Sequence, residues 1–512
     1  MAVAIEGAVL ALYKANLYKD SVALMRINER ILALEGIRRA TLVMGTGANK
    51  DILEEANMLP DGVQAAGPGD LIVVIESDTE AQGRAALIVA EQALEGQTDS
   101  PRDPALPARD LRAFVQGEAL APSAQLAQIS VPGPYAAAEA MKALKRGCHV
   151  FLFSDNVSLA EECALKALAV RKGLLVMGPD CGTAILNGVP LGFANAVRRG
   201  PIGIVAASGT GLQEASTQIH LAGSGISHAI GTGGRDISAA VGCSTTLQGI
   251  DLLAADADTR VILVVSKPPS AAVTDRIMER LAEAAKPAVV LFIGSRVEAR
   301  SGIHPASTLA EAVALAIGLA GGGAVSGEER FPPRPSFVAS QKYIRALYSG
   351  GTFCYEAQAI WREAGLAAWS NAPLDSGRML VDPLHSVEHT AIDLGDDRFT
   401  VGRPHPMIDP SIRIERLQTE ARDKAVAVIL LDVVLGYGSH PDPAGALSPA
   451  IREARLEAAR EGRALAVVAF VCGTEEDPQA RSVQARTLRD AGALVFAGST
   501  QAAQAAARLV AK

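Results

Sequence analysis

The feature that most constrains the fold is a pair of short apolar strands, each followed directly by a glycine-rich loop. The segment 202–207 is rich in small and β-branched residues and runs into the sequence SGTG at 208–211, after which apolar residues recur at helical spacing. The second segment, 226–230, ends in the sequence GTGGRD at 231–236. In a parallel sheet, such loops lie at the carboxyl edge, where α/β proteins bind ligands.

Loops of this kind bind anions for three physical reasons. Glycine lets the backbone approach an anion closely, free N–H groups at a helix start donate hydrogen bonds to it, and the helix dipole favours its negative charge. A single loop is more often a tight turn, whereas two loops one strand apart favour an anion site. The predicted phosphate-binding residues in this stretch are Ser208, Gly209, Thr210, Gly211, Thr232, Gly233 and Gly234.

The rest of the chain extends this pattern. Its 512 residues are too many for one core, and the alternation of strands with helices indicates parallel sheets. The expected fold class is α/β, with tandem Rossmann-like and flavodoxin-like parallel-sheet domains and a small α+β N-terminal module of order αβαβα. The predicted divisions are the N-terminal module (1–95), a linker (96–124), two parallel-sheet domains (125–198 and 199–320), a second linker (321–337) and a C-terminal α/β domain (338–512) that opens with a helix at 338–348.

Composition argues against several classes of protein. The net charge of -8 argues against nucleic acid or an anionic membrane surface as the main partner. The six cysteines form no CxxC pair, so we expect neither a zinc site nor a disulfide framework, and we predict no metal. The scattered cysteines fit reduced thiols, so we expect a cytoplasmic protein. No uninterrupted apolar run reaches about 20 residues, so we predict no membrane span.

A second group of loops follows the strands expected between residues 125 and 183. Loops after three successive strands are able to surround a nucleotide-like ligand, although the GxGxxG fingerprint of NAD-binding folds is missing. Lys267, just past a later strand, is a candidate cation for an anionic ligand, with a solvated lysine as the alternative. The residues predicted to bind such a nucleotide-like ligand are Pro132, Gly133, Ser154, Asp155, Asn156, Gly178, Pro179 and Asp180.

Six blocks of the sequence carry a resemblance to a known family: YKDSVALMRI near the N-terminus, GPDCGTAILNGVPLGFAN, GPIGIVAASGTGLQE, ISHAIGTGGRD, ALYSGGTFCYEA and AIDLGDD. They resemble the FdrA family, which is itself similar to the α subunit of succinyl-CoA synthetase fused to the carboligase domain of its β subunit. The resemblance implies a CoA-binding domain at 125–198, a ligase domain at 199–320 and a carboligase domain at 338–512. It also implies a phosphate between two facing helix N-termini, the second coming from Ser349, Gly350, Gly351 and Thr352 or from the loop 435–439.

Two departures from that family pattern affect the chemistry. The synthetase carries its phosphoryl group on a histidine in a GHAG loop, which this sequence lacks, and His304 in SGIHPAS is the nearest candidate for a catalytic histidine. An ordinary surface histidine is the alternative for that position. No stretch has room for an ATP-grasp domain, so we do not expect the chain alone to be an ADP-forming ligase.

Three functions remain in competition. The first is a subunit of an oxamate carbamoyltransferase in allantoin or purine nitrogen use, which FdrA-type proteins imply, converting oxalurate and phosphate to oxamate and carbamoyl phosphate. The second is an NDP-forming acyl-CoA synthetase chain with CoA as cofactor and a separate ATP-grasp partner. The third is a non-catalytic CoA-binding or nucleotide-binding scaffold.

All three functions imply other subunits as partners, and we expect a homo-oligomer with neither nucleic acid nor membrane as a partner. Phosphate is the expected co-substrate and CoA a candidate cofactor. Candidate carboxylate partners are Arg235, Arg398 and Arg403, for each of which a surface ion pair is the alternative. His405 and His440 are candidates for the general acid or base.

Overall fold

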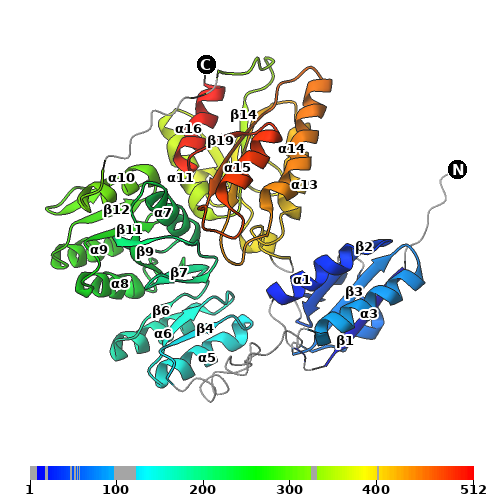
Figure 1. Ribbon diagram of the computed structural model, residues 1–512, viewed down its shortest axis with the longest axis horizontal. Coiled ribbons are helices and arrows are strands. Elements are labelled where there is room, and N and C mark those ends of the chain that lie inside the picture. The colour runs from blue at the N-terminus through cyan, green and yellow to red at the C-terminus, as the bar shows by residue number, and fades with distance from the viewer. Residues whose placement is uncertain are drawn as a thin grey trace. The chain divides into compact units, whose positions relative to one another are not determined.

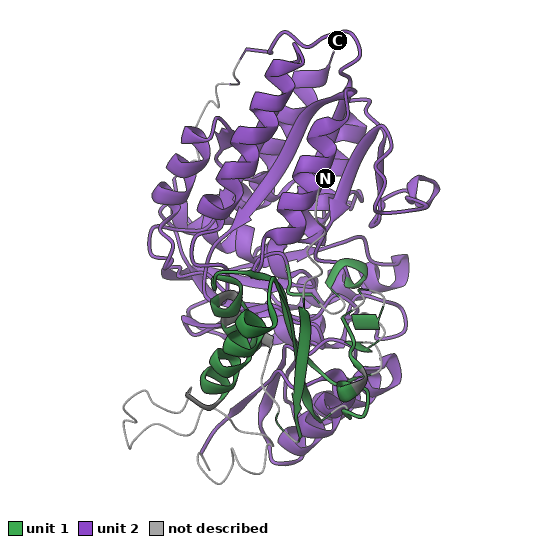
Figure 2. Ribbon diagram, turned by 90° about the vertical axis from the view of Figure 1, so that its right-hand side faces the viewer, with its two compact units in different colours: residues 1–110, 397–405 green, residues 111–396, 406–512 purple. Residues whose placement is uncertain are grey.

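The computed structural model describes residues 8–15, 17, 21–46, 49–50, 53–54, 56, 58–67, 69–96, 123–323, 331, 333–400 and 403–511. The chain divides into two compact units, coloured separately in Figure 2. Unit 1 comprises Met1–Asp110 with Asp397–His405, and unit 2 comprises Leu111–Asp396 with Pro406–Lys512. Most of the predicted linker 96–124 and part of the linker 321–337 lie outside the described residues.

Unit 1 is an antiparallel three-stranded sheet with strand order β1-β3-β2 (Figure 1). The buried side chains of both long helices and of β2 and β3 form one core, which contains Ile27, Ile31, Val73 and Ala90. The predicted order αβαβα was wrong at its start, because the first element is a strand whose half-buried residues show no alternation. The elements are β1 (Ala8–Lys14), α1 (Ser21–Leu32), β2 (Ile37–Met44), a 3₁₀ turn (Asp61–Val63), β3 (Leu71–Ser77) and α3 (Glu80–Gly96).

Unit 2 begins with a small parallel sheet of order β4-β5-β6. Alanines and leucines of both helices pack on it, and a reciprocal capping box between Ser158 and Glu161 fixes the start of the second helix. Three loops therefore leave the carboxyl edge of this sheet as predicted. The elements are β4 (Leu126–Ile129), α5 (Gly133–Lys145), β5 (His149–Leu152), α6 (Leu159–Lys172) and β6 (Val176–Met177).

The second sheet has seven strands in the order β13-β12-β11-β9-β10-β7-β8, and all but the hairpin β7–β8 run parallel. Helices α7 and α10 cover one face and α8 and α9 the other. The elements are β7 (Thr183–Leu186), β8 (Val189–Gly192), β9 (Arg199–Ala206), α7 (Gly209–Leu221), β10 (Ile226–Gly231), α8 (Ser244–Ala255), β11 (Val261–Ser266), α9 (Ala271–Glu283), β12 (Ala288–Phe292), β13 (Ile303–Pro305) and α10 (Leu309–Leu319).

The hairpin β7–β8 was not predicted, although its signal is in the sequence. Its turn is Asn187-Gly188, and both residues have positive φ, 52° and 80°. An Asn-Gly pair between apolar runs is the strongest short-range hairpin signal, because both turn residues must adopt positive φ. The hairpin pairs with β10 and so extends the second sheet.

The third sheet is entirely parallel, with order β15-β16-β14-β17-β18-β19. Helices α11 and α16 share one core with the sheet, and Figure 1 shows α13, α14 and α15 on its other side. The elements are β14 (Tyr343–Tyr348), α11 (Gly351–Glu363), β15 (Ala368–Ser370), β16 (His389–Asp393), α13 (Ser411–Arg422), β17 (Val426–Val434), α14 (Pro443–Arg460), β18 (Ala466–Cys472), α15 (Arg481–Asp490), β19 (Leu494–Phe496) and α16 (Ser499–Val510).

The predicted helix at 338–348 was wrong, because its second half is the strand β14. Alternate residues Ile344 and Ala346 face the α11 core, while Arg345 is buried in an ion pair with Glu420 at 2.9 Å. A charged residue inside the apolar run obscured the strand pattern. Hydrogen bonding to β16 on one side and β17 on the other outweighs the weak local preference of this segment for a helix.

The α/β class with parallel sheets is confirmed. All six cysteines carry free thiols, as expected for a chain without a disulfide framework. Among the described residues, no helix combines the length and the apolar character needed to cross a bilayer.

A buried carboxylate joins the second and third sheets. Asp477, after β18, accepts hydrogen bonds from Asn195 Nδ2 at 2.9 Å and from the Ala196 N–H at 2.7 Å, both in the loop before β9. It also accepts one from the Thr474 N–H at 2.8 Å, which fixes its own loop. Burial raises the pKa of Asp477.

We expect the substitution Asp477→Ala to lower the free energy of unfolding by about 2–4 kcal/mol, because it leaves buried donors unpaired on both sides of this contact. Urea denaturation of the whole chain measures the change. The matched control is Asp490→Ala at the exposed end of α15, which should change the unfolding free energy by less than about 0.5 kcal/mol. Equal effects of the two substitutions would refute the role of Asp477.

Candidate functional site

The candidate site lies where the strand connections diverge at the carboxyl edges of the two large sheets. In the second sheet the chain leaves β9 towards β10 and leaves the neighbouring β11 towards β12, so the connections diverge between these strands. In the third sheet they diverge in the same way between β14 and β17. Open α/β sheets bind ligands at such switch points. Helices α7 and α11 begin there.

The N-termini of α7 and α11 face each other in direct contact. The hydroxyls of Ser208 and Thr352 are hydrogen-bonded across the contact. A Cβ on Gly350 would lie 2.4 Å from Thr210 Cγ2, and one on Gly211 would lie 2.9 Å from Thr352 Cγ2. Glycine is required at both positions because the helices approach so closely. The structure therefore brings the predicted loops 208–211 and 350–352 together.

The first turns of both helices present N–H groups without a protein acceptor. The Ser208 hydroxyl caps α7 by accepting from the Gly211 N–H at 3.0 Å, and Gly350 offers α11 no side-chain cap. Among the described residues the N–H groups of Gly209, Thr210, Gly351, Thr352 and Phe353 make no hydrogen bond. Unsatisfied N–H groups on two opposed helix dipoles favour a bound anion.

Charged side chains surround this pair of N-termini. Lys267 follows β11 at the same crevice as Ser208; burial lowers its pKa and nearby Asp180 raises it. Asp393 ends β16, and its pKa is raised to about 7, by burial first and then by Asp396, Asp432 and Asp180, against a hydrogen bond from the Gly395 N–H. Lys267 is a cation that an anionic ligand at the crevice can reach.

Three other predicted phosphate residues have different partners. The N–H and hydroxyl of Ser349 both bond the buried carboxylate of Asp432, so Ser349 fixes the loop before α11. Thr232 is fully buried, with its hydroxyl on backbone carbonyls. Gly233 has a φ of 81° and would place a Cβ 2.4 Å from the Pro179 carbonyl. The second glycine loop therefore packs on the GPDCG loop, while Gly234 has open space beside it.

The loops predicted to hold CoA or a nucleotide converge at the carboxyl edge of the small sheet. A Cβ on Gly133 would lie 2.4 Å from the Asp155 carbonyl and 2.5 Å from the Asn156 carbonyl. The Asp180 N–H donates to the Ser154 carbonyl at 3.0 Å. The Ser154 hydroxyl donates in turn to the Val131 carbonyl at 2.5 Å, next to Pro132. Gly178 and Pro179 precede Asp180 in this group of loops, and Pro179 also contacts Gly233.

The structure gives each of the remaining candidates another element or another partner. His304 is on the edge strand β13, three strands from β9, or about 14 Å across the sheet at the usual strand spacing. Arg235 is ion-paired with Glu162 at 2.9 Å. His440 Nδ1 accepts from the Asp442 N–H at 3.0 Å. Arg398, Arg403 and His405 belong to unit 1.

Sequence reasoning missed two buried glutamates behind the facing helices. Glu214 on α7 accepts from the Ser499 N–H at 2.9 Å, and Glu356 on α11 accepts from the Leu309 N–H at 2.8 Å. Their carboxylates thus satisfy the starts of α16 and α10. Burial and the neighbouring Glu356 carboxylate raise the pKa of Glu214 to about 7, against a hydrogen bond from the Ser499 N–H. The only signal was a glutamate after each glycine loop, at a buried helical position.

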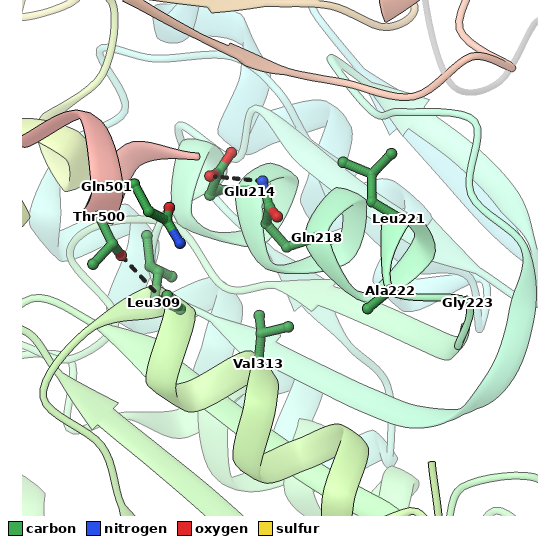
Figure 3. Close-up of a pocket in the computed structure, with 10 residues that line it drawn as sticks. Glu214, Gln218, Leu221, Ala222, Gly223, Leu309, Val313, Thr500 and Gln501 are labelled. Atoms are coloured by element: carbon green, nitrogen blue, oxygen red, sulfur yellow. Dashed lines mark hydrogen bonds between the residues drawn. The ribbon is translucent and has the colours of Figure 1, made fainter. Parts of the chain in front are cut away.

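Glu214 also lines a cavity of about 490 Å³ between α7, α10 and α16. Figure 3 shows Gln218 and Leu221 on one side of it, and Leu309, Val313 and Thr500 on the other. None of its lining residues belongs to the first turn of α7 or α11. The cavity is therefore separate from the facing N-termini.

Comparisons with known proteins agree with this architecture. Residues 347–509 match a CoA-ligase family model, residues 198–294 match a CoA binding domain, and residues 8–106 match a domain described as AllF, heavy metal-associated. The chain thus carries a CoA-ligase domain and a CoA-binding domain. The CoA-binding match lies C-terminal to the 125–198 segment predicted for that domain.

One curated relative and two solved structures are also similar. The uncharacterized protein YahF of Escherichia coli (strain K12) is 42% identical over 510 residues, covering 98% of both chains. A dinucleotide-forming acetyl-coenzyme A synthetase of Ca. Korarchaeum cryptofilum is 16% identical, covering 76% of this chain and 82% of that one at a TM-score of 0.32. An ATP citrate lyase of Methanothrix soehngenii is 20% identical, covering 41% and 38%, at a TM-score of 0.31.

The metal chemistry of the N-terminal module does not follow from the name of its matching domain. Residues 8–106 contain neither cysteine nor histidine, the ligands that thiophilic and borderline metals prefer. In the described ranges of the whole chain, no cluster of three or more His, Cys, Asp or Glu side chains has a metal-binding arrangement.

We expect the Glu214→Gln variant to match the wild type in stability at pH 4 or below and to exceed it by about 3 kcal/mol at pH 8. The folded-state pKa of Glu214, about 7, lies above the model value of 4.5. Folding therefore takes up a proton between these values, and the stability of the wild type falls as pH rises through that window, whereas glutamine mimics the protonated acid throughout. Urea denaturation at several pH values gives both curves, and parallel curves would contradict the assignment.

Proposed function

The chain belongs to the same protein family as YahF of Escherichia coli, and on that premise we propose that it is a CoA-ligase-like enzyme that transfers an acyl group between a phosphate and the thiol of CoA. In this proposal the N-termini of α7 and α11 hold the phosphate. The observation that carries it is the set of unsatisfied N–H groups on two helix starts in contact, with the Ser208 and Thr352 hydroxyls between them.

The geometry suits a phosphate in charge and in shape. A phosphate dianion accepts several hydrogen bonds at once, and it interacts favourably with both helix dipoles. Lys267 adds a positive charge at the edge of the crevice. Preorganised donors of this kind stabilise the oxyanion that develops as the carbon–oxygen bond to the phosphate breaks.

In the proposed reaction the thiol sulfur attacks the acyl carbon and the phosphate leaves. The loops around Gly133, Asn156 and Asp180 are the proposed CoA site, since they meet at one carboxyl edge. His304 lies three strands from β9, so the phosphoryl group is proposed to stay on the substrate. A separate ATP-grasp subunit would supply the nucleotide step.

We expect Gly350→Ala to weaken phosphate binding at least tenfold, because its Cβ would lie 2.4 Å from Thr210 Cγ2 and would push the helix starts apart. Isothermal titration calorimetry of the whole chain with inorganic phosphate measures the affinity. The matched control is Gly318→Ala in α10, where a Cβ meets nothing within 4 Å, and its affinity should equal that of the wild type. A wild-type chain that binds no phosphate would overturn the proposed function.

A second candidate is transfer of a carbamoyl group, with the chain as a subunit of an oxamate carbamoyltransferase. Two observations favour it: the resemblance of the motif blocks to the FdrA family, and the distance of His304 from the facing helices. The phosphate site would then act in phosphorolysis of oxalurate.

Separate titrations with CoA, phosphate and carbamoyl phosphate distinguish the candidates. Binding of both CoA and phosphate supports the acyl-CoA reaction. Binding of phosphate and carbamoyl phosphate without CoA supports carbamoyl transfer, and release of carbamoyl phosphate from oxalurate by the complex with partner subunits would establish it. A chain that binds none of the three would be a scaffold.

A further inference from the structure

Asp393 is held rigidly at the carboxyl end of β16, beside the start of α11. Its N–H donates to Asn371 Oδ1 and its carbonyl accepts from Asn371 Nδ2, both at 2.9 Å. Its Oδ1 accepts from the Gly395 N–H at 2.9 Å. Its Oδ2 accepts no hydrogen bond from any residue that the structure describes. One oxygen of this half-buried carboxylate is therefore fixed in place and available to a ligand.

The available oxygen lies against the proposed phosphate site. A Cβ built on Gly351 would be 2.9 Å from Asp393 Oδ2, so no side chain separates this oxygen from the first residue of α11. The N–H of Gly351 is one of the unsatisfied donors there. An anion bound to α11 is therefore within reach of Asp393 Oδ2.

The groups around Asp393 favour its protonated form. Asp396 in its own loop, Asp432 on β17 and Asp180 in the GPDCG loop all raise its pKa, which burial has already raised, and the Gly395 N–H lowers it. Asp432 is itself paired with Arg413 at 2.8 Å. On α11 the facing groups are Cys354 and Tyr355, whose own pKa values burial raises to about 12, so both are neutral at pH 7.

We propose, resting on the function proposed above, that Asp393 is the catalytic residue that carries the thiol proton to the departing phosphate. The step begins with Asp393 ionised: the S–H bond breaks as the S–C bond forms, and the proton moves to Asp393 Oδ2. The C–O bond to phosphate then breaks with its electron pair on that oxygen, which takes the proton from Asp393. Acyl phosphate and thiol thus give thioester and hydrogen phosphate, and Asp393 returns to its starting state.

The pKa of Asp393 suits this role. A group that accepts a proton in one step and donates it in the next is most effective when its pKa is near the working pH. Protonated Asp393 donates a hydrogen bond to a bound tetrahedral anion, whereas the ionised form repels it. Anion affinity should therefore depend on the protonation of this one carboxyl group.

Sulfate is the probe that isolates this effect, because it stays a dianion at neutral pH while phosphate titrates. We expect sulfate affinity of the wild-type chain to fall about tenfold from pH 6 to pH 8. At pH 6 the Asp393→Asn variant should bind sulfate within about threefold of the wild type, which also shows that the variant is folded. Its sulfate affinity should not decrease between pH 6 and pH 8.

Two further variants separate Asp393 from its neighbours. Asp396→Asn removes a carboxylate that raises the pKa of Asp393. The decrease in sulfate affinity should therefore remain but occur at lower pH. Glu214→Gln removes another group with a pKa of about 7 and should leave the curve unchanged. A decrease in sulfate affinity with rising pH that persists in the Asp393→Asn variant would overturn the role of Asp393 but not the proposed phosphate site. Absence of sulfate binding at every pH would count against both.

Discussion

The contact between the N-termini of α7 and α11 is the constraint on which the rest of unit 2 depends. Ser208 and Thr352 touch across it, and glycine at 211 and 350 is what allows the two backbones to approach. Two positive helix ends in contact repel each other unless negative charge lies between or behind them. The arrangement therefore calls for anions.

The protein itself supplies hydrogen-bond acceptors for two other helix starts. Glu214 and Glu356, on the same two helices, accept hydrogen bonds from the starts of α16 and α10 and bind these four helices together. The N–H groups of the first turns of α7 and α11 are left without such a partner among the described residues. Internal carboxylates thus satisfy two helix ends, and a ligand is left to satisfy the other two. Asp393, whose pKa is raised to about 7, is suited to bind that ligand in its protonated form.

Part of the candidate site could be predicted from the sequence because its signals are local. A glycine loop between an apolar strand and a helix is recognisable within ten or so residues, and the loop 208–211 lies between β9 and α7 as predicted. The loop 350–352 follows the strand β14, where the sequence predicted a helix. Arg345 shows the limit of this reasoning. Its buried pairing with Glu420 is a tertiary contact, so the strand around it was mistaken for a helix. Ser349 was assigned to the phosphate for the same reason, since only the fold brings Asp432 to it.

The sequence by itself determined the α/β class, the glycine loops at strand ends and the absence of a disulfide framework, because each depends on neighbouring residues or on composition. The tertiary structure decided which loops meet. It set α7 against α11, packed the loop 231–234 on the GPDCG loop and left His304 three strands from β9. It also raised the pKa values of Glu214 and Asp393, since burial and neighbouring charge come from residues far apart in the chain.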